Sequence, residues 1–465
     1  MIPINKNYIY IVKAFIFSCI LLFLYSIYKT NISNLYFSSL IFILIFIILT
    51  ENFLSKENIS LLRIITLLAF CFGFFLSCFY IFLSPEDFIG NYNNKVGNFK
   101  FHEDDIINIF TLISVGMISI YLALNIDIFK FINLSRKKFL VEEKFQFKSE
   151  KHKQFLFFCF LTISFLHFSL LFLVNKFGLF RHGLADSIIL PFHLNGILRY
   201  AKGLLGFLIL FMFFDIFKNE KKLVLYTIII AFILIVFNLS ISQGRFAVLV
   251  LSVPILLYYL ISMNIDKQLK VLPIILIFMF LIFFGISTIE IIRHSQYENI
   301  RFLSFDNLER LFKFLSFSNF FKFLVFRIEG IKEIFIISLS EPSLNKFMTY
   351  FFELDDLKKV SESFWPVSYE GTNFGRTLGI FGMFYLSNNI YIFFFGIFFL
   401  FFILSNIEKF LYNQNLKTVS FYFVLSTFPV LWGNWTFGYI SRRMIIFSIF
   451  IIFFLLIKKL FISKK

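Results

Sequence analysis

Apolar runs of membrane-spanning length recur along this 465-residue chain, with short polar segments between most of them. The hydrocarbon core of a bilayer is about 30 Å thick, and a helix needs roughly 20 apolar residues to cross it. Hydrophobic residues make up 59% of the chain, against about 45–50% in soluble domains, and lipid-facing surface explains the surplus. The sequence therefore predicts an all-α, polytopic membrane bundle of about twelve transmembrane helices, at 8–28, 35–50, 61–84, 105–125, 154–174, 198–217, 223–240, 246–262, 271–289, 389–405, 418–436 and 444–460.

One polar connection is much longer than the others and divides the chain into three parts. We expect the first nine transmembrane helices in residues 1–290 and one large extracytoplasmic loop in residues 291–372. Residues 373–465 are expected to hold a re-entrant or interfacial segment and the last three helices. Whatever recognition or chemistry the protein performs is expected in the long connection and the helix ends beside it.

The long loop is rich in apolar residues and is predicted to contain amphipathic helices. In the stretch 305–315, Leu308, Leu311 and Leu315 follow helical spacing on one face. Such helices would lie on the outer leaflet or fold over the bundle as a lid. The segment 373–388 is short, contains three glycines and carries Arg376, so we expect it to enter the membrane without crossing it.

Basic residues in the short loops predict the orientation of the chain. A cytoplasmic N-terminus places the basic loop 126–153 and the C-terminal tail on the cytoplasmic side as well. The other predicted cytoplasmic loops are 51–60, 218–222, 263–270 and 406–417. Residues 291–372 have a net charge of −1, which leaves +17 for the rest of a chain whose net charge is +16. The charge distribution therefore agrees with an external loop, and the overall positive charge indicates cytoplasmic loops rather than nucleic-acid binding.

Neither disulfides nor a metal site are expected. The four cysteines, Cys19, Cys71, Cys78 and Cys159, all lie inside apolar runs. The pair Asp355 and Asp356 lies in an acidic run followed by lysines, which is typical of a solvated surface. No cofactor is predicted.

Arginines gather at the predicted outer face, where the positive-inside rule disfavours them. A guanidinium group binds phosphate oxygens through two parallel hydrogen bonds. The cluster therefore suggests a lipid-linked phosphate or diphosphate as ligand, although for any one arginine a simple anchoring role at the lipid headgroups is the alternative. The predicted diphosphate-binding residues are Arg181, Arg199, Arg245, Arg293, Arg376, Arg442 and Arg443.

Two residues near the long loop are candidates for a general base. His294 follows the ninth predicted span directly after Arg293, and a histidine changes charge near neutral pH. Glu370 precedes the glycine-rich run. For His294 the alternative is an ordinary residue at the membrane interface, and for Glu370 it is an ion pair with an arginine.

Three sequence features resemble the bacterial O-antigen and oligosaccharide repeat-unit polymerases, which are related to the O-antigen ligases. The first is about twelve spans with one large late loop. The second is the turn Ser240-Ile-Ser-Gln-Gly-Arg245, and the third is the run Asn373-Phe-Gly-Arg-Thr-Leu-Gly-Ile-Phe-Gly382 after the loop. The stretch Leu190-Pro-Phe-His-Leu-Asn-Gly196 is also similar to this family.

The resemblance implies metal-independent glycosyl transfer at the outer face of the bacterial inner membrane, in the synthesis of surface polysaccharide or the O-antigen of lipopolysaccharide. The donor would be a glycan on undecaprenyl diphosphate and the acceptor a lipid-linked repeat unit. The arginines would hold the diphosphate and stabilise the charge that develops as it leaves. The implied partners are the lipid-linked oligosaccharide, the bilayer and a chain-length regulator protein.

Other functions are compatible with parts of the pattern. An O-antigen ligase differs from a polymerase only in its acceptor, which the sequence does not display. A flippase for lipid-linked oligosaccharides has similar spans, but its arginines should line a central cavity. A glycosyltransferase with acidic residues in its first outer loop fits less well, because residues 29–34 contain no carboxylate. A channel or structural protein fits least, because no polar stripe recurs along the spans.

Overall fold

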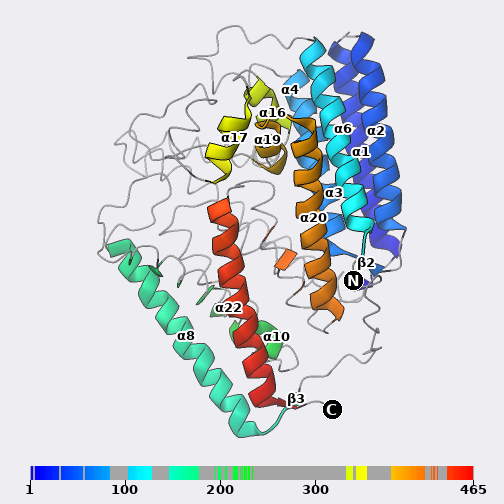
Figure 1. Ribbon diagram of the computed structural model, residues 1–465. Helices are drawn as coiled ribbons and strands as arrows, with labels where there is room; N and C mark the ends of the chain where they lie inside the picture. Colours follow the sequence, from blue (N-terminus) through cyan, green and yellow to red (C-terminus); the bar gives the residue numbers. More distant parts are fainter. Residues whose placement is uncertain are drawn as a thin grey trace, which may run out of the picture. The chain divides into compact units, whose positions relative to one another are not determined.

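The computed structural model describes residues 2–3, 6–30, 33–55, 58–83, 103–127, 146–176, 194, 197–198, 201, 205–206, 213–217, 220, 222–223, 225–227, 229–230, 233, 331–338, 342–352, 379–413, 420, 423–424, 427 and 437–463. This part of the chain is helical apart from turns and two pairs of two-residue strands (Figure 1). The helices are α1 (Lys6–Thr30), α2 (Ser33–Leu54), α3 (Leu61–Phe70), the π-helix η1 (Cys71–Leu76), α4 (Ser77–Leu83), α6 (Glu103–Asn125), α8 (Glu150–Lys176), α10 (Phe214–Phe217), α16 (Ile331–Ser338), α17 (Leu344–Phe351), α19 (Ile380–Tyr385), α20 (Ile390–Asn413) and α22 (Phe437–Phe461). The strands are β1 (Ile2–Pro3), β2 (Asn58–Ile59), β3 (Gln146–Phe147) and β4 (Ile462–Ser463).

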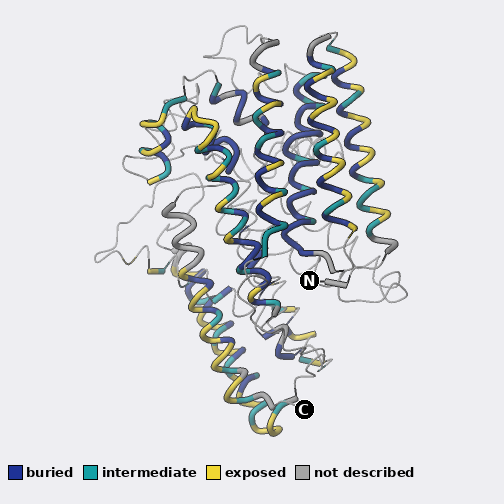
Figure 2. The backbone as a smooth tube through the Cα atoms, turned by 45° about the vertical axis from the view of Figure 1, so that its right-hand side comes forward, coloured by how far each residue is buried: buried dark blue, intermediate teal, exposed yellow. Residues whose placement is uncertain are grey.

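Within the described residues, six stretches are long and apolar enough to cross a membrane: Ile9–Thr30, Leu35–Leu54, Leu61–Leu83, Ile106–Asn125, Glu150–Leu173 and Ile390–Tyr412. They confirm the apolar helices predicted at 8–28, 35–50, 61–84, 105–125, 154–174 and 389–405. Figure 2 shows exposed positions along these helices. Large apolar residues occupy many of them, among them Phe17, Leu44, Phe165 and Phe399. Apolar residues that cover whole exposed faces of long helices are typical of a protein in lipid, and the chain is an all-α membrane protein.

The structure describes the other predicted spans only in part or not at all. The spans at 246–262 and 271–289 and the amphipathic stretch 305–315 lie outside the described residues, and those at 198–217, 223–240 and 418–436 are described only at scattered positions. The last predicted span corresponds to α22, which begins at Phe437 rather than near residue 444. The total of about twelve spans therefore stays a prediction.

The chain forms two compact units. Unit 1 comprises Met1–Arg136 and Phe321–Ile440, and unit 2 comprises Lys137–Phe320 and Ser441–Lys465. Each unit combines segments that are far apart in the sequence. The boundaries of the two units differ from those of the three predicted parts, 1–290, 291–372 and 373–465. Those parts describe the expected membrane topology and remain predictions.

Phenylalanine rings from separate helical elements form the core of unit 1. Phe23 of α1, Phe42 of α2, Phe75 of η1 and Phe110 of α6 are buried, and their contacting ring centroids lie 4.8–5.7 Å apart. Edge-to-face and tilted pairs of this kind stabilise a core beyond simple burial. On the other side of α6, helix α20 packs along it and Ser119 Oγ donates a hydrogen bond to Phe394 O at 2.8 Å.

A π-helical segment interrupts the third apolar span at its middle. In a π turn the hydrogen bonds join residues i and i+5, so the turn holds one residue more than an α turn. Two neighbouring rings in η1 are both buried as a result: Phe74 contacts Phe381, and Phe75 contacts Phe23 and Phe46. The same span therefore packs against α1 and α2 on one side and against α19 on the other.

Helices from the predicted loop and re-entrant segment pack against the other helices of unit 1. Helix α16 contacts α4, η1, α6 and α19, and α17 contacts α19 (Figure 1). Ser343 begins α17 and its hydroxyl accepts a hydrogen bond from the backbone N–H of Lys346, as expected of an N-cap. Helix α19 has six residues, which is too short to cross a bilayer core of about 30 Å.

Unit 2 joins the predicted basic loop to the C-terminal end of α22. Strands β3 and β4 pair antiparallel, with Gln146 opposite Ser463. Lys148 Nζ donates to the carbonyl oxygens of Lys459 and Leu460, each at 2.9 Å, so a cation lies at the C-terminus of α22. Lys153 forms ion pairs with Glu150 at 3.2 Å and Glu220 at 3.0 Å.

Candidate functional site

Most of the predicted site residues lie outside the described residues: Arg181, Arg199, Arg245, Arg293, His294, Glu370 and Arg376. The backbone of Arg442 and Arg443 belongs to the second turn of α22, whereas the sequence placed both residues before the last span. The structure therefore does not test whether these arginines converge, and the predicted diphosphate site stays a prediction.

The structure instead reveals a buried polar cluster that sequence reasoning missed. Its members are Ser60, Arg63, Asn125, Glu408 and Lys409, at the ends of α3, α6 and α20 in unit 1. Ser60, Arg63, Glu408 and Lys409 are each at most 8% exposed. Charged groups are rarely buried to this extent unless they are paired and hydrogen-bonded.

Glu408 of α20 caps the N-terminus of α3. Its Oε1 accepts hydrogen bonds from the backbone N–H groups of Leu61 at 2.9 Å and Leu62 at 3.5 Å, and its Oε2 accepts one from the Ser60 hydroxyl. The first N–H groups of a helix have no partner within that helix, and the helix dipole favours a negative charge at this end. Although Ser60 is the N-cap residue of α3, its hydroxyl makes no cap bond there and contacts the carboxylate.

Two cationic side chains, Arg63 and Lys409, bind the C-terminal end of α6. Arg63 Nη2 donates to Leu124 O at 2.9 Å and to Asn125 Oδ1 at 3.1 Å. Lys409 Nζ donates to Ile126 O at 2.9 Å. The carbonyl groups at the end of a helix lack partners within it and attract positive charge. The Arg63 guanidinium also lies 5.1 Å from the ring centroid of Phe53 of α2, within cation–π range.

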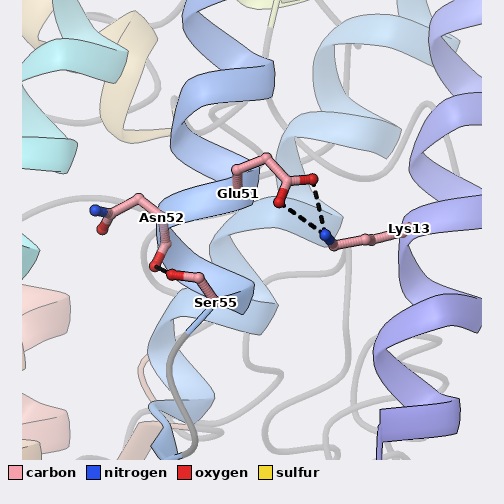
Figure 3. Close-up of polar contacts among 4 residues, drawn as sticks. All are labelled: Lys13, Glu51, Asn52 and Ser55. Atoms are coloured by element: carbon pink, nitrogen blue, oxygen red, sulfur yellow. Dashed lines mark hydrogen bonds and ion pairs between the residues drawn. The ribbon is translucent and has the colours of Figure 1, made fainter.

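Peripheral polar contacts surround this end of unit 1. Lys13 Nζ of α1 lies 2.8 and 2.7 Å from the two carboxylate oxygens of Glu51 of α2 (Figure 3). Near them, Ser55 Oγ donates to Asn52 O at 3.2 Å. Strand β1 pairs with β2 here, so the N-terminus lies beside the segment between α2 and α3. The Lys13–Glu51 pair is partly exposed, and such pairs contribute roughly 0–1 kcal/mol.

The cluster is suited to holding helices together. Arg63, Glu408 and Lys409 each bond to a helix end, and Glu408 lies 348 residues from Ser60 in the sequence, while Lys409 lies 283 residues from Ile126. Among the described residues, no group of three or more His, Cys, Asp or Glu side chains gathers where a metal ion could bind. The cluster therefore fixes α3, α6 and α20 to one another at one end of unit 1.

The position of Arg63 was a signal that could have revealed this cluster. A charged residue three positions inside an apolar span demands a partner. Glu408 gives a weaker signal, because Asn406, Glu408 and Lys409 fall in the predicted cytoplasmic loop 406–417. In the structure α20 continues to Asn413 and contains all three.

The second well-defined feature is the junction of α19 and α20. Phe381 of α19 is buried against Phe70, Phe74 and Phe393, with ring centroids 5.1–5.7 Å apart. After α19 the chain turns at Asn388, which has a φ of 49°. Asn389 then caps α20, because its Oδ1 accepts hydrogen bonds from the N–H groups of Tyr391 at 2.9 Å and Ile392 at 3.2 Å.

In comparisons with known proteins, no family model, no curated protein and no solved structure matches this chain.

Proposed function

We propose that the protein polymerises lipid-linked oligosaccharide repeat units at the outer face of the bacterial inner membrane, in surface polysaccharide or O-antigen synthesis. In this proposal both chain termini are cytoplasmic and residues 291–372 form an extracytoplasmic loop. The basis is the family resemblance of the glycine–arginine runs, together with the arginines predicted at one face of a membrane bundle.

The packing of α16, α17 and α19 is the structural observation that carries the proposal. These helices come from the predicted loop and re-entrant segment. Helix α16 contacts α4, η1 and α6, α19 contacts α20, and α17 contacts α19. A glycan polymerase needs an external segment that folds onto the membrane helices, because its lipid-linked substrates present their sugars just above the bilayer. A loop that stayed apart from the bundle would not meet this need.

The proposed reaction is a displacement at the anomeric carbon of the donor glycan. A hydroxyl of the acceptor repeat unit forms the new glycosidic C–O bond, and the C–O bond to undecaprenyl diphosphate breaks. His294 or Glu370 takes the hydroxyl proton, and undecaprenyl diphosphate leaves with the bonding electrons. Arg181, Arg199, Arg245, Arg293, Arg376, Arg442 and Arg443 supply the positive charge that stabilises the departing diphosphate.

Replacement of Arg245 tests this role. Lysine keeps the positive charge but loses the two parallel hydrogen bonds, so we expect Arg245→Lys to shorten glycan chains nearly as much as Arg245→Ala. The measurement is the ladder of surface glycan lengths in a deletion strain complemented with each variant, alongside the protein level in the membrane.

Lys222→Ala is the matched control, because Lys222 is an exposed basic residue in a predicted cytoplasmic loop. It should leave the ladder unchanged. A normal distribution of glycan lengths with Arg245→Lys would indicate that Arg245 acts only as a membrane anchor. A deletion strain with full-length glycan chains that are not attached to lipid A core would indicate the ligase instead.

A further inference from the structure

The start of α8 and the end of α22 meet at one edge of unit 2 (Figure 1). Strand β3, before α8, pairs with strand β4, after α22. The ring of Phe461 stacks on that of Phe155 at a centroid distance of 5.3 Å, and the backbone N–H of Lys148 donates to Phe461 O at 3.2 Å. Backbone and side-chain contacts therefore hold the two helix ends together.

Both helices reach this edge at the end of an apolar stretch. The apolar span of α8 runs from Glu150 to Leu173. The span predicted at 444–460 ends one residue before Phe461, the last residue of α22. Two helices from distant parts of the sequence thus place the edge at the same level, the boundary between the hydrocarbon core and the lipid headgroups.

Three exposed lysines from two segments lie at this edge: Lys148, Lys151 and Lys459. An ammonium group has three N–H donors, and Lys148 uses two of them on the carbonyl oxygens of Lys459 and Leu460, each at 2.9 Å. Its third donor is left for another acceptor. The same bonds cover the carbonyl end of α22, which would otherwise repel an anion.

The acidic side chains described near these lysines are already paired. Glu150 and Glu220 both bond to a fourth lysine, Lys153, and residues 441–465 contain no Asp or Glu. Within the part of the chain that the structure describes, none of the three exposed lysines forms an ion pair. The edge therefore carries positive charge that the described acidic residues do not neutralise.

Exposed apolar residues continue from the lysines along both helices. On α8, Phe155 and Phe158 follow Lys151 at i+4 and i+7, and their side chains are 51% and 67% exposed. On α22, Leu456 precedes Lys459 by three residues and is 50% exposed. Each helix thus presents a stripe with a cation at the headgroup level and apolar side chains deeper in the membrane.

This combination matches an amphiphile with an anionic head. We propose that the edge of unit 2 binds an anionic phospholipid, with its phosphate between Lys148 and Lys151 and its acyl chains along the exposed stripes of α8 and α22. Lys459 adds positive charge beside the phosphate. A zwitterionic phospholipid also offers a phosphate, but its own cationic group would be repelled by the lysines. Lysines next to a membrane attract the anionic lipids of the cytoplasmic leaflet, which is the predicted side of this edge.

Thermal unfolding of the purified full-length protein in detergent tests the preference for anionic lipid. Phosphatidylglycerol and phosphatidylcholine with identical acyl chains are added at the same concentration. A ligand that binds the folded state raises the Tm, so we expect phosphatidylglycerol to raise it by several degrees more than phosphatidylcholine does. The double variant Lys151→Gln/Lys459→Gln should lose this difference. Lys151→Arg/Lys459→Arg should keep it, because arginine retains the charge.

Lys29→Gln is the matched control, because Lys29 is also exposed at the end of an apolar span, Ile9–Thr30, but belongs to unit 1. It should leave the lipid preference unchanged. Equal effects of the two lipids on the wild-type protein overturn the proposal, and that comparison needs no variant to fold. A preference that survives in Lys151→Gln/Lys459→Gln, or that Lys29→Gln abolishes as well, also overturns it.

Glycerol phosphate separates a lipid site from a site for free phosphate. It carries a phosphate but no acyl chains, so it should leave the Tm unchanged at concentrations where phosphatidylglycerol raises it. Equal stabilisation by glycerol phosphate overturns the assignment to a lipid. Native mass spectrometry gives a second readout, in which phosphatidylglycerol should stay bound to the wild-type protein and be lost from Lys151→Gln/Lys459→Gln. None of these measurements depends on the proposed polymerase activity.

Discussion

Glu408 and Lys409 are neighbours in α20 and bind opposite ends of two different helices. The carboxylate bonds to the N-terminus of α3, and the ammonium group bonds to the C-terminal carbonyl of Ile126 after α6. Each charge thus meets the end of a helix dipole that favours it. Arg63 adds a second cation at the end of α6. Three charges can be buried together here because backbone groups, rather than water, satisfy them.

Removal of the Glu408 carboxylate is predicted to destabilise the protein. Glu408→Ala leaves the Leu61 N–H and the Ser60 hydroxyl without their buried acceptor, at a cost on the order of 1–3 kcal/mol. Glu408→Gln retains one acceptor oxygen and should cost less. The measurement is thermal unfolding of the detergent-solubilised protein.

Glu150→Ala is the control for this series. Glu150 pairs with Lys153, but its side chain is largely exposed, so the change should stay within about 0.5 kcal/mol. If Glu408→Ala melted at the same temperature as Glu150→Ala, the cluster would contribute nothing to stability.

At the scale of elements, two glycines let α19 pack closely against longer helices. A Cβ added at Gly116 of α6 would lie 2.4 Å from Phe381 Cε1, and one added at Gly396 of α20 would lie 2.2 Å from Phe384 Cε1. Phe381 cannot move away easily, because the rings of Phe70, Phe74 and Phe393 surround it. The missing side chains therefore leave room for the two rings of α19.

Alanine at either glycine is predicted to displace α19. We expect Gly116→Ala and Gly396→Ala to destabilise the protein by about 1–3 kcal/mol, as overpacking typically does. Gly206→Ala should be tolerated, because its Cβ would meet His167 at an ordinary 3.5 Å. The measurement is again the melting temperature in detergent.

A second substitution separates steric overlap from other effects of alanine. In Gly396→Ala, the further change Phe384→Leu removes the ring that overlaps and should restore part of the lost stability. If the double variant lost more stability than the two single variants lost together, overlap with Phe384 would not be the cause.

The apolar helices were predictable from sequence, whereas their polar contacts were not. Hydropathy and length predicted α2 and α6 to within a few residues at each end, because both depend on local composition. The end of α20 was placed near residue 405 instead of Asn413, because Asn406, Glu408 and Lys409 look like loop residues until their partners are known. The partners of Glu408 and Lys409 lie hundreds of residues away, and a single sequence does not pair them. The proposed arginine and base residues, such as Arg245 and His294, remain predictions.

At the scale of the whole molecule, segments predicted to share one side of the membrane come together within each unit. In unit 1 the N-terminal strand pairs with Asn58–Ile59, and the end of α20 reaches the end of α6. In unit 2 the tail strand pairs with Gln146–Phe147, and Lys153 reaches Glu220. All of these segments were predicted to be cytoplasmic, so the groupings agree with their sharing one side of the membrane, and the choice of side stays a prediction.

Labelling of two exposed positions tests that orientation. We expect Asn345→Cys in α17 to react with an impermeant thiol reagent in intact cells, and Lys151→Cys at the start of α8 to react only after the cells are opened. Both side chains are exposed, so access through the membrane decides the result. Labelling of Lys151→Cys alone in intact cells would show that the orientation is the reverse of the predicted one.

The π-helical turn at Cys71–Leu76 makes the length of this span as important as its composition. Its additional residue rotates everything that follows by about 100° around the helix axis. The rotation directs the buried residues Ser77, Cys78 and Ile81 of α4 towards the protein interior, where α4 packs on α1. Deletion of one residue here would leave the hydropathy profile almost unchanged but would turn that face towards lipid. Insertions and deletions in this short stretch should therefore be selected against, even though nearly any apolar side chain satisfies the membrane.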